Sequence, residues 1–253
     1  MRSLALCYHD VAPEGVKSGF QTPDAETYKL TVKAFEDHLG AIVSNQRRSP
    51  YKILLTFDDG GAGACHTADA IEKAGFRGTF FVTSTFVGQP AFVTAAQARD
   101  LHNRGHIIGS HGATHRGRMN RMPADRLSRE WADSVAALSS IIGTAIRTAS
   151  VPSGYYSPRV AQAAAAEGIR EIFTQEPTTR VRQSFGCEVV GRFTMRSWTA
   201  ASRVGSLVRG SVWPRVEDWS LWRMRGIAKS IGGNAYTELR RAYYHRRSPE
   251  GVS

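Results

Sequence analysis

The chain has 253 residues, of which 42% are apolar, and this suffices to bury a sizeable core in a single domain. Its formal charge of +11 favours an anionic partner, such as an anionic polymer or membrane surface, but no nucleic-acid-binding signature accompanies the charge, which argues against nucleic acid. Three cysteines without paired spacing exclude a disulfide framework. No apolar run suits a membrane span of ~18 residues or a secretory signal. We therefore expect a cytoplasmic protein with at most peripheral membrane contact.

Short β-rich apolar runs alternate with amphipathic helical patterns along most of the chain. Strands are predicted at residues 4–8, 53–57, 79–82 and 107–108. A capping box at Thr94 and Gln97 begins a helix that Gly105 ends, and Pro123 and Pro158 open two further helices. This alternation predicts an α/β fold with a mainly parallel sheet.

The pattern weakens after residue 198, where tryptophans are scattered among arginines. We predict a basic extension over residues 199–253, with one or two helices, that packs on a unit spanning residues 1–198. Residues 201–253 contain ten Lys or Arg and four Asp or Glu, so an anionic membrane or polymer is a candidate partner. Trp213, Trp219 and Trp222 are expected to pack the extension against the rest of the fold, with a sugar-stacking platform as the alternative.

Two adjacent carboxylates, Asp58 and Asp59, follow the predicted strand at 53–57 and precede Gly60. Ligands of α/β sheets bind at the carboxyl ends of strands, so both acids lie where a site is expected. Adjacent side chains on an extended chain point in different directions, which lets one carboxylate bind a metal while the other transfers protons. A simple Asp-Asp-Gly turn is the alternative that this segment alone leaves open.

Two histidines, His111 and His115, follow the predicted strand at 107–108. Imidazoles at i and i+4 meet on one face if the segment forms a helical turn, which is a zinc-binding geometry. One carboxylate added to this pair gives three ligands and leaves a fourth position for water, as in catalytic zinc sites. The set predicts a divalent metal, zinc first and cobalt, nickel or manganese as alternatives, and hydrolysis of an amide or ester.

These motifs together resemble the polysaccharide deacetylases, the NodB-homology group or carbohydrate esterase family 4. The resemblance rests on the Thr-Phe-Asp-Asp-Gly run at 56–60 and the histidine pair, with residues 79–82 between them, and it extends from about residue 4 to 194. It implies a distorted (β/α) barrel with Asp58 as general base. The divalent metal would be held by Asp59, His111 and His115.

The family's third motif, Arg-x-Pro-x-Gly, is matched at residues 150–154, but serine stands at the arginine position. We expect this loop to contact the substrate through Pro152, Ser153, Gly154 and Tyr155, with the Ser153 N–H helping to stabilise an oxyanion. In the family the arginine helps to orient the base. Ser150 leaves that role open, and Arg192 is the proposed substitute.

A downstream Asp-Trp-type motif and a late Leu-x-His, which supplies the family's general acid, are absent from their usual positions. The first strand ends instead at Tyr8-His9-Asp10, which resembles exopolysaccharide deacetylases with a permuted motif order. That resemblance makes His9 the candidate general acid and Asp10 a supporting residue. A purely structural role for His9 is the alternative.

The sequence thus predicts a metal-dependent hydrolase that removes N-acetyl groups from amino-sugar units of a polysaccharide or oligosaccharide and releases acetate. An N-acetylated glycan substrate is what the resemblance implies. Two alternatives stay open: a non-catalytic glycan-binding barrel, suggested by Ser150 and the missing motifs, and a deacetylase of a lipid-linked or small aminosugar.

Overall fold

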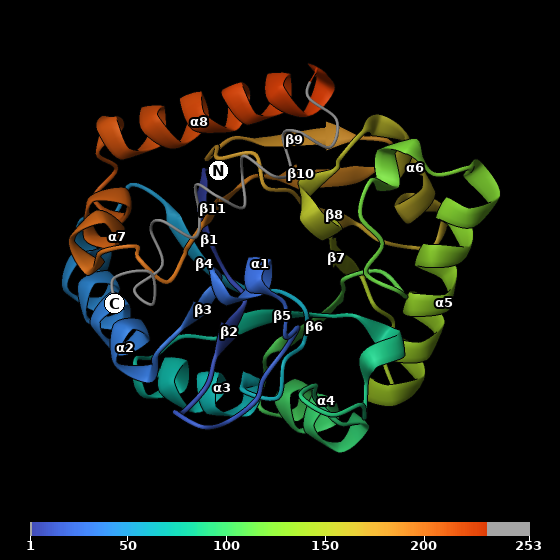
Figure 1. Cartoon of the computed structure of the whole chain (residues 1–253), viewed down its shortest axis with the longest axis horizontal. Coiled ribbons are helices and arrows are strands. Elements are labelled where there is room, and N and C mark those ends of the chain that lie inside the picture. The colour runs from blue at the N-terminus through green and yellow to red at the C-terminus, as the bar shows by residue number, and fades with distance from the viewer. Residues whose placement is uncertain (1, 232–253) are drawn as a thin grey trace.

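The computed structural model describes residues 2–231, with the backbone alone over 227–231, and shows one strongly curved sheet surrounded by helices (Figure 1). The strand order is β11-β1-β4-β5-β6-β7-β8-β10-β9, and all neighbours are parallel except β10 and β9. These strands are β1 Ser3–Tyr8, β4 Lys52–Phe57, β5 Gly78–Val82, β6 Ile107–Ser110, β7 Thr148–Ser150, β8 Glu171–Phe173, β9 Val181–Ser184, β10 Cys187–Val190 and β11 Arg192–Thr194. The predicted strands are therefore confirmed.

Most of the helices lie outside the sheet, while α1 and a small parallel pair of strands lie near the centre of the view in Figure 1. The small pair consists of β2 Asp10–Val11 and β3 Lys29–Leu30. The helices are α1 Pro23–Glu26, α2 Val32–Asn45, α3 Ala64–Lys73, α4 Ala95–Asn103, α5 Ala124–Ile142, α6 Pro158–Ala166, α7 Ala201–Val208 and α8 Val212–Ile231. The capping box at Thr94 and Gln97 is present at the start of α4, as predicted.

Gly191 connects β10, the neighbour of the edge strand β9, to β11, which forms the opposite edge of the sheet. β10 pairs with β8, whereas β11, which begins at Arg192, pairs with β1. A Cβ at position 191 would collide with the carbonyl oxygen of Glu176. Glycine therefore lets the chain pass from one edge of the sheet to the other at this point. This near-closure, with helices outside, confirms the predicted distorted (β/α) barrel.

Successive residues of β1 face opposite sides of the sheet and so belong to two different cores. Leu4, Leu6 and Tyr8 join the large core beneath the helices. Ala5 belongs instead to a small core with Phe81, Phe173 and Val190, which come from β5, β8 and β10. The small core therefore fills the inside of the barrel, and the alternation places Cys7 and then His9 above it.

The C-terminal part of the described chain differs from the prediction in one respect. Val204, Leu207 and Val208 of α7 are buried, and α7 packs on α2. Trp213 on α8, however, is 82% exposed, and Trp219 is 45% exposed. The prediction that these two tryptophans pack the extension against the fold is wrong, because they lie on the outward side of α8. Residues 232–253 of the predicted extension lie outside the described residues.

Among residues 2–231, no helix combines the length and the apolar character needed to span a bilayer.

Candidate metal centre and active site

The two adjacent carboxylates lie where β4 ends. The Asp58 N–H donates to the Tyr8 carbonyl oxygen at 3.0 Å, which continues the pairing of β4 with β1. Asp59 then adopts a left-handed conformation with φ of 75°, and Gly60 follows with φ of 79°. Aspartate visits this conformation more readily than most residues. The chain turns sharply there, and the two carboxylates meet different neighbours.

Asp59, His111 and His115 form a compact group of potential metal ligands. The Nε2 atoms of His111 and His115 lie 3.4 Å and 3.3 Å from Asp59 Oδ1. That oxygen is buried and accepts no hydrogen bond. A buried orphaned oxygen beside two imidazoles suits a cation, and one carboxylate with two imidazoles matches a catalytic zinc set. The residues therefore fit a divalent metal.

The two histidines converge through a loop and not through the helical turn that would also bring their spacing onto one face. The His111 N–H donates to the Val82 carbonyl oxygen at 2.9 Å, so His111 still follows the line of β6. Gly112 has φ of 76° and His115 has φ of 55°. These left-handed residues fold the segment back and bring the ring centroids to 5.0 Å. Glycine at position 112 favours this turn over a helix.

Glu130 on α5 anchors this loop and is not among the site residues predicted from the sequence. Its buried carboxylate accepts hydrogen bonds from the Thr114 N–H at 2.7 Å and from the Thr114 hydroxyl at 2.9 Å. A Cβ at Gly112 would press on the same carboxylate. The signal is nevertheless in the sequence, because Glu130 lies three residues after Leu127 on the buried face of α5, where a charge needs partners.

Arg192 lies fully buried inside the barrel and holds Asp58 with two hydrogen bonds. Its Nη1 and Nη2 donate to Asp58 Oδ1 at 2.6 Å and Oδ2 at 2.8 Å. The guanidinium also donates to the Thr174 carbonyl and the Thr56 hydroxyl and lies over the Phe81 ring. This forked geometry is the strongest that an arginine makes with a carboxylate. Burial raises the pKa of Asp58, but Arg192 opposes it and the pKa falls to about 2.

Ser150, at the position of the missing family arginine, links Asp58 to the metal group. Its hydroxyl donates to Asp58 Oδ1 at 3.2 Å and lies 2.5 Å from His111 Nδ1. A hydroxyl that donates to Asp58 must accept from His111, so Nδ1 carries the proton. His111 Nε2 is then unprotonated, as metal binding requires.

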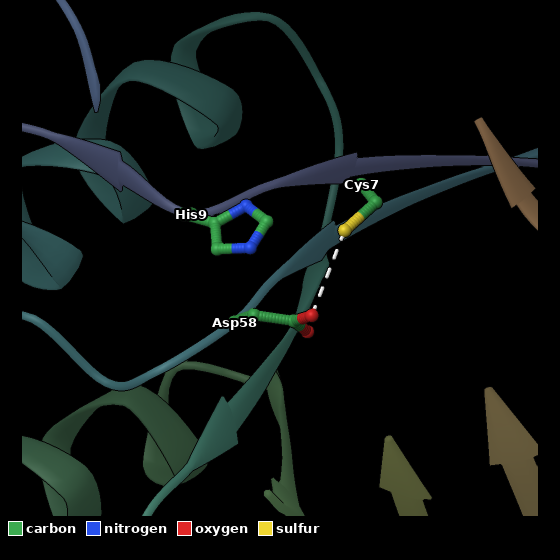
Figure 2. A group of neighbouring side chains, drawn as sticks. All are labelled: Cys7, His9 and Asp58. Carbon is green, nitrogen blue, oxygen red and sulfur yellow. Dashed lines mark hydrogen bonds between the residues drawn. The ribbon is translucent and has the colours of Figure 1, made fainter. Parts of the chain in front are cut away.

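His9 and Cys7 lie beside Asp58, as Figure 2 shows. The Cys7 thiol, whose pKa is raised by burial, donates weakly to Asp58 Oδ2 at 3.6 Å. His9 Nδ1 is buried without a hydrogen-bond partner, and the ring lies against Tyr28 with centroids 4.4 Å apart. Burial lowers the pKa of His9, and the nearby carboxylates of Asp59 and Asp58 oppose that effect. Cys7 is likewise not among the predicted site residues, although its position two residues before His9 indicates the same side of β1.

Cys7, His9 and Asp58 place three potential ligand atoms within 4.8 Å of one another, but they suit a metal poorly. Both Asp58 oxygens already accept hydrogen bonds from the Arg192 cation. The thiol would also have to lose its proton, which its raised pKa opposes. We therefore assign the metal to the group of Asp59.

Asp10 braces the turn that follows Asp59. Its Oδ1 accepts from the Ser18 hydroxyl at 2.6 Å, and the Ser18 oxygen accepts from the Gly63 N–H at 2.7 Å. Asp10 Oδ2 is buried without a partner. Burial raises the pKa of Asp10 to about 6, although the Ser18 bond opposes the rise. Asp10 thus acts on the site through the backbone of the turn.

The predicted oxyanion loop follows β7 and lies beside the loop of His115, where Gly117 approaches the Ser153 side chain. It spans Pro152, Ser153, Gly154 and Tyr155. Ser153 is exposed and has φ of 56°. Together with Asp59 and His115, it accounts for three of the six described non-glycine residues with positive φ. Such strain concentrates at functional sites.

Fold and site together define an α/β barrel with a carboxylate and imidazole metal group at the ends of its strands. The sequence profile of the polysaccharide deacetylase family matches residues 45–172, about half of the chain. The protein belongs to this family. The Bacillus subtilis (strain 168) protein YxkH, which is named after the same family, is 24% identical over 168 residues. That match covers 66% of this chain and 60% of YxkH, so the chain spans less than two thirds of this relative.

Solved structures show the same fold. A polysaccharide deacetylase from Bacillus cereus superposes with a TM-score of 0.67 at 16% identity and covers 82% of this chain and 69% of its own. IcaB from Ammonifex degensii gives a TM-score of 0.63 at 21% identity and covers 86% and 96% of the two chains. At these identities the likeness establishes the barrel fold alone.

Proposed function

We propose that the protein is a metal-dependent deacetylase that hydrolyses the N-acetyl groups of amino-sugar units in a polysaccharide or oligosaccharide and releases acetate. The observation that carries the proposal is the difference in surroundings between the adjacent carboxylates of Asp58 and Asp59. Asp59 faces two imidazoles, whereas both oxygens of Asp58 accept hydrogen bonds from Arg192. Family membership supports an N-acetylated glycan as the substrate.

Asp59, His111 and His115 would hold the metal, which we propose to be zinc. When bound there, a divalent ion polarises the amide carbonyl and makes a bound water more acidic. Ser150 supports the binding, because its hydroxyl fixes the proton of His111 on Nδ1.

Asp58 is proposed to take the proton from the attacking water. Its pKa of about 2 keeps it ionised at neutral pH, so it is available as an acceptor. A carboxylate with so low a pKa is a modest base, and its contribution comes mainly from orientation. Four donors fix that orientation: two from Arg192 and one each from Ser150 and Cys7.

His9 is proposed to protonate the leaving nitrogen. It is close to Asp58, and its Nδ1 has no competing hydrogen bond. Because burial lowers the pKa of His9, its protonated form gives up the proton readily. The Ser153 N–H is proposed to help stabilise the oxyanion that forms during attack.

The test is acetate release by the purified, metal-loaded protein from N-acetylglucosamine monomers, oligomers, polymers and lipid-linked forms. His111→Ala and His115→Ala should lose both bound metal and activity, with the fold retained by circular dichroism. Arg48→Met, which removes an exposed charge on the barrel surface, serves as the control. Glycan binding without acetate release by the loaded protein would favour the non-catalytic alternative, and full metal occupancy in either histidine variant would remove the proposed centre.

A further inference from the structure

The outward face of α8 is unusually apolar for a helix on the surface of a water-soluble fold. We define this face by six exposed side chains of the described part of the helix. They are Val212 at 65%, Trp213 at 82%, Val216 at 44%, Trp219 at 45% and Met224 at 56% exposed, together with the exposed Arg223. Glu217 is also exposed but pairs with Arg203 of α7. Figure 1 shows α8 lying along the rim of the molecule with one long side uncovered.

The inward side of α8 is no more apolar than this outward face, which reverses the usual arrangement. Its half-buried residues include four that follow one another at spacings of three, three and one, namely Arg215, Asp218, Leu221 and Trp222. Arg215 donates to the Tyr51 hydroxyl at 2.8 Å. A helix that packs on a core through its apolar stripe shows polar residues to solvent. Here the polar contacts hold the helix, and aromatic and aliphatic side chains face outward.

The charges of α8 favour an anionic surface. The helix contains four Arg or Lys and two acidic residues. Both acids, Glu217 and Asp218, pair with Arg203 of α7 at 2.7 Å. Arg223 lies over the Trp219 ring at 5.2 Å on the outward face. Its cation therefore lies among exposed apolar groups, and the exposed acid of the described part of α8, Glu217, is paired with Arg203.

We propose that the outward face of α8 docks in the plane of an anionic lipid bilayer. Tryptophan is amphipathic and prefers the headgroup level, and aliphatic side chains between the tryptophans reach the acyl boundary. Arginine on the same face adds attraction to anionic headgroups. This combination matches an interfacial helix, whereas a glycan polymer offers neither an apolar phase nor a reason for exposed Val212 and Met224.

The position of α8 determines which side of the docked enzyme would face the membrane. The helix contacts Tyr51, which immediately precedes β4, through Arg215, whereas Asp58 and Asp59 follow the other end of β4. α8 therefore begins at the end of the sheet away from the metal group. Docking through α8 leaves the mouth of the barrel open to water, where an extended glycan can enter.

The experiment uses the full chain and vesicles of phosphatidylcholine with or without phosphatidylglycerol. The wild-type protein should pellet with the anionic vesicles and far less with the neutral ones. Trp213→Ala should weaken binding about tenfold, because it removes the largest exposed apolar side chain. Val16→Ala, a change at an exposed apolar residue outside α8, is the control and should leave binding unchanged.

A second pair of variants separates charge from apolar contact. Arg223→Gln should weaken binding about fivefold, and Arg129→Gln, on the exposed side of α5, should have no effect. Equal pelleting of wild type and Trp213→Ala would overturn the proposal, as would absence of pelleting at low salt. Sedimentation that shows a dimer dissociated by Trp213→Ala would assign the face to a second copy of the chain instead. Acetate release is scored separately, so failure of docking leaves the proposed function untouched.

Discussion

Replacing Arg192 with methionine tests whether the buried ion pair holds Asp58 in place. Methionine keeps the unbranched stem but removes the cation and its two hydrogen bonds to Asp58. Asp58 is then left buried and uncompensated. Breaking a buried pair in this way costs about 3–5 kcal/mol of unfolding free energy.

The ion pair also makes the stability of the protein depend on pH. In the wild type the pKa of Asp58 is about 2, below the ordinary value, so the pair contributes stability above about pH 4 that is lost as the pH falls towards 2. A shift of about two units corresponds to about 2.5 kcal/mol. In Arg192→Met burial acts without the cation, so the pKa of Asp58 rises above its ordinary value. The variant therefore loses more stability than the wild type as the pH rises from 4 to 7.

Urea denaturation at pH 4 and pH 7 measures both effects. Arg48→Met, a change at an exposed arginine, should stay within about 0.5 kcal/mol of the wild type. The double variant Asp58→Asn, Arg192→Met carries no buried charge at this pair and should be destabilised by less than the sum of its single changes. A loss below about 1 kcal/mol in Arg192→Met, or strict additivity in the double variant, would refute the reasoning.

Three further predictions concern single carboxylates and His9. Asp58→Asn should keep the metal and lower turnover about 10²- to 10⁴-fold, whereas Asp59→Asn should lose both the metal and turnover. If elemental analysis shows metal retained in Asp59→Asn but lost in Asp58→Asn, the roles of the two carboxylates are exchanged. His9→Ala should retain metal, lower turnover on an acetamide by about 10²-fold or more, and spare an activated aryl ester; equal losses on both substrates would make His9 a positioning residue. The pKa of Asp10 is raised to about 6, so the wild type should lose about 3 kcal/mol of stability as the pH rises from 4 to 7. Asp10→Asn should not show this loss, and parallel pH profiles of the two proteins in urea denaturation would contradict the assignment.

The sequence alone determined the elements that local patterns encode. Strands, helix starts and helix ends follow from apolar periodicity, capping residues and glycine, all of which act over a few residues. The candidate ligands Asp59, His111 and His115 could be predicted for the same reason, because each lies within five residues of the end of a recognisable strand. Parallel strands bring their carboxyl ends to one edge of the sheet, so strand-end residues from distant segments meet without further information.

Only the tertiary structure decided the contacts that depend on the closure of the barrel. Arg192 reaches Asp58 across 134 residues of sequence because Gly191 lets β11 pair with β1. The hydroxyl of Ser150 bridges Asp58 and His111 only once β7 lies beside β6.

The outward position of Trp213 also could not be predicted from the sequence. Composition predicts that a tryptophan is buried, but which side of α8 faces the fold depends on where Arg215 and Asp218 find their partners on Tyr51 and Arg203. Pairings of this kind follow from strand register and helix docking, which are set by the whole folded chain and leave no mark on a short stretch of sequence.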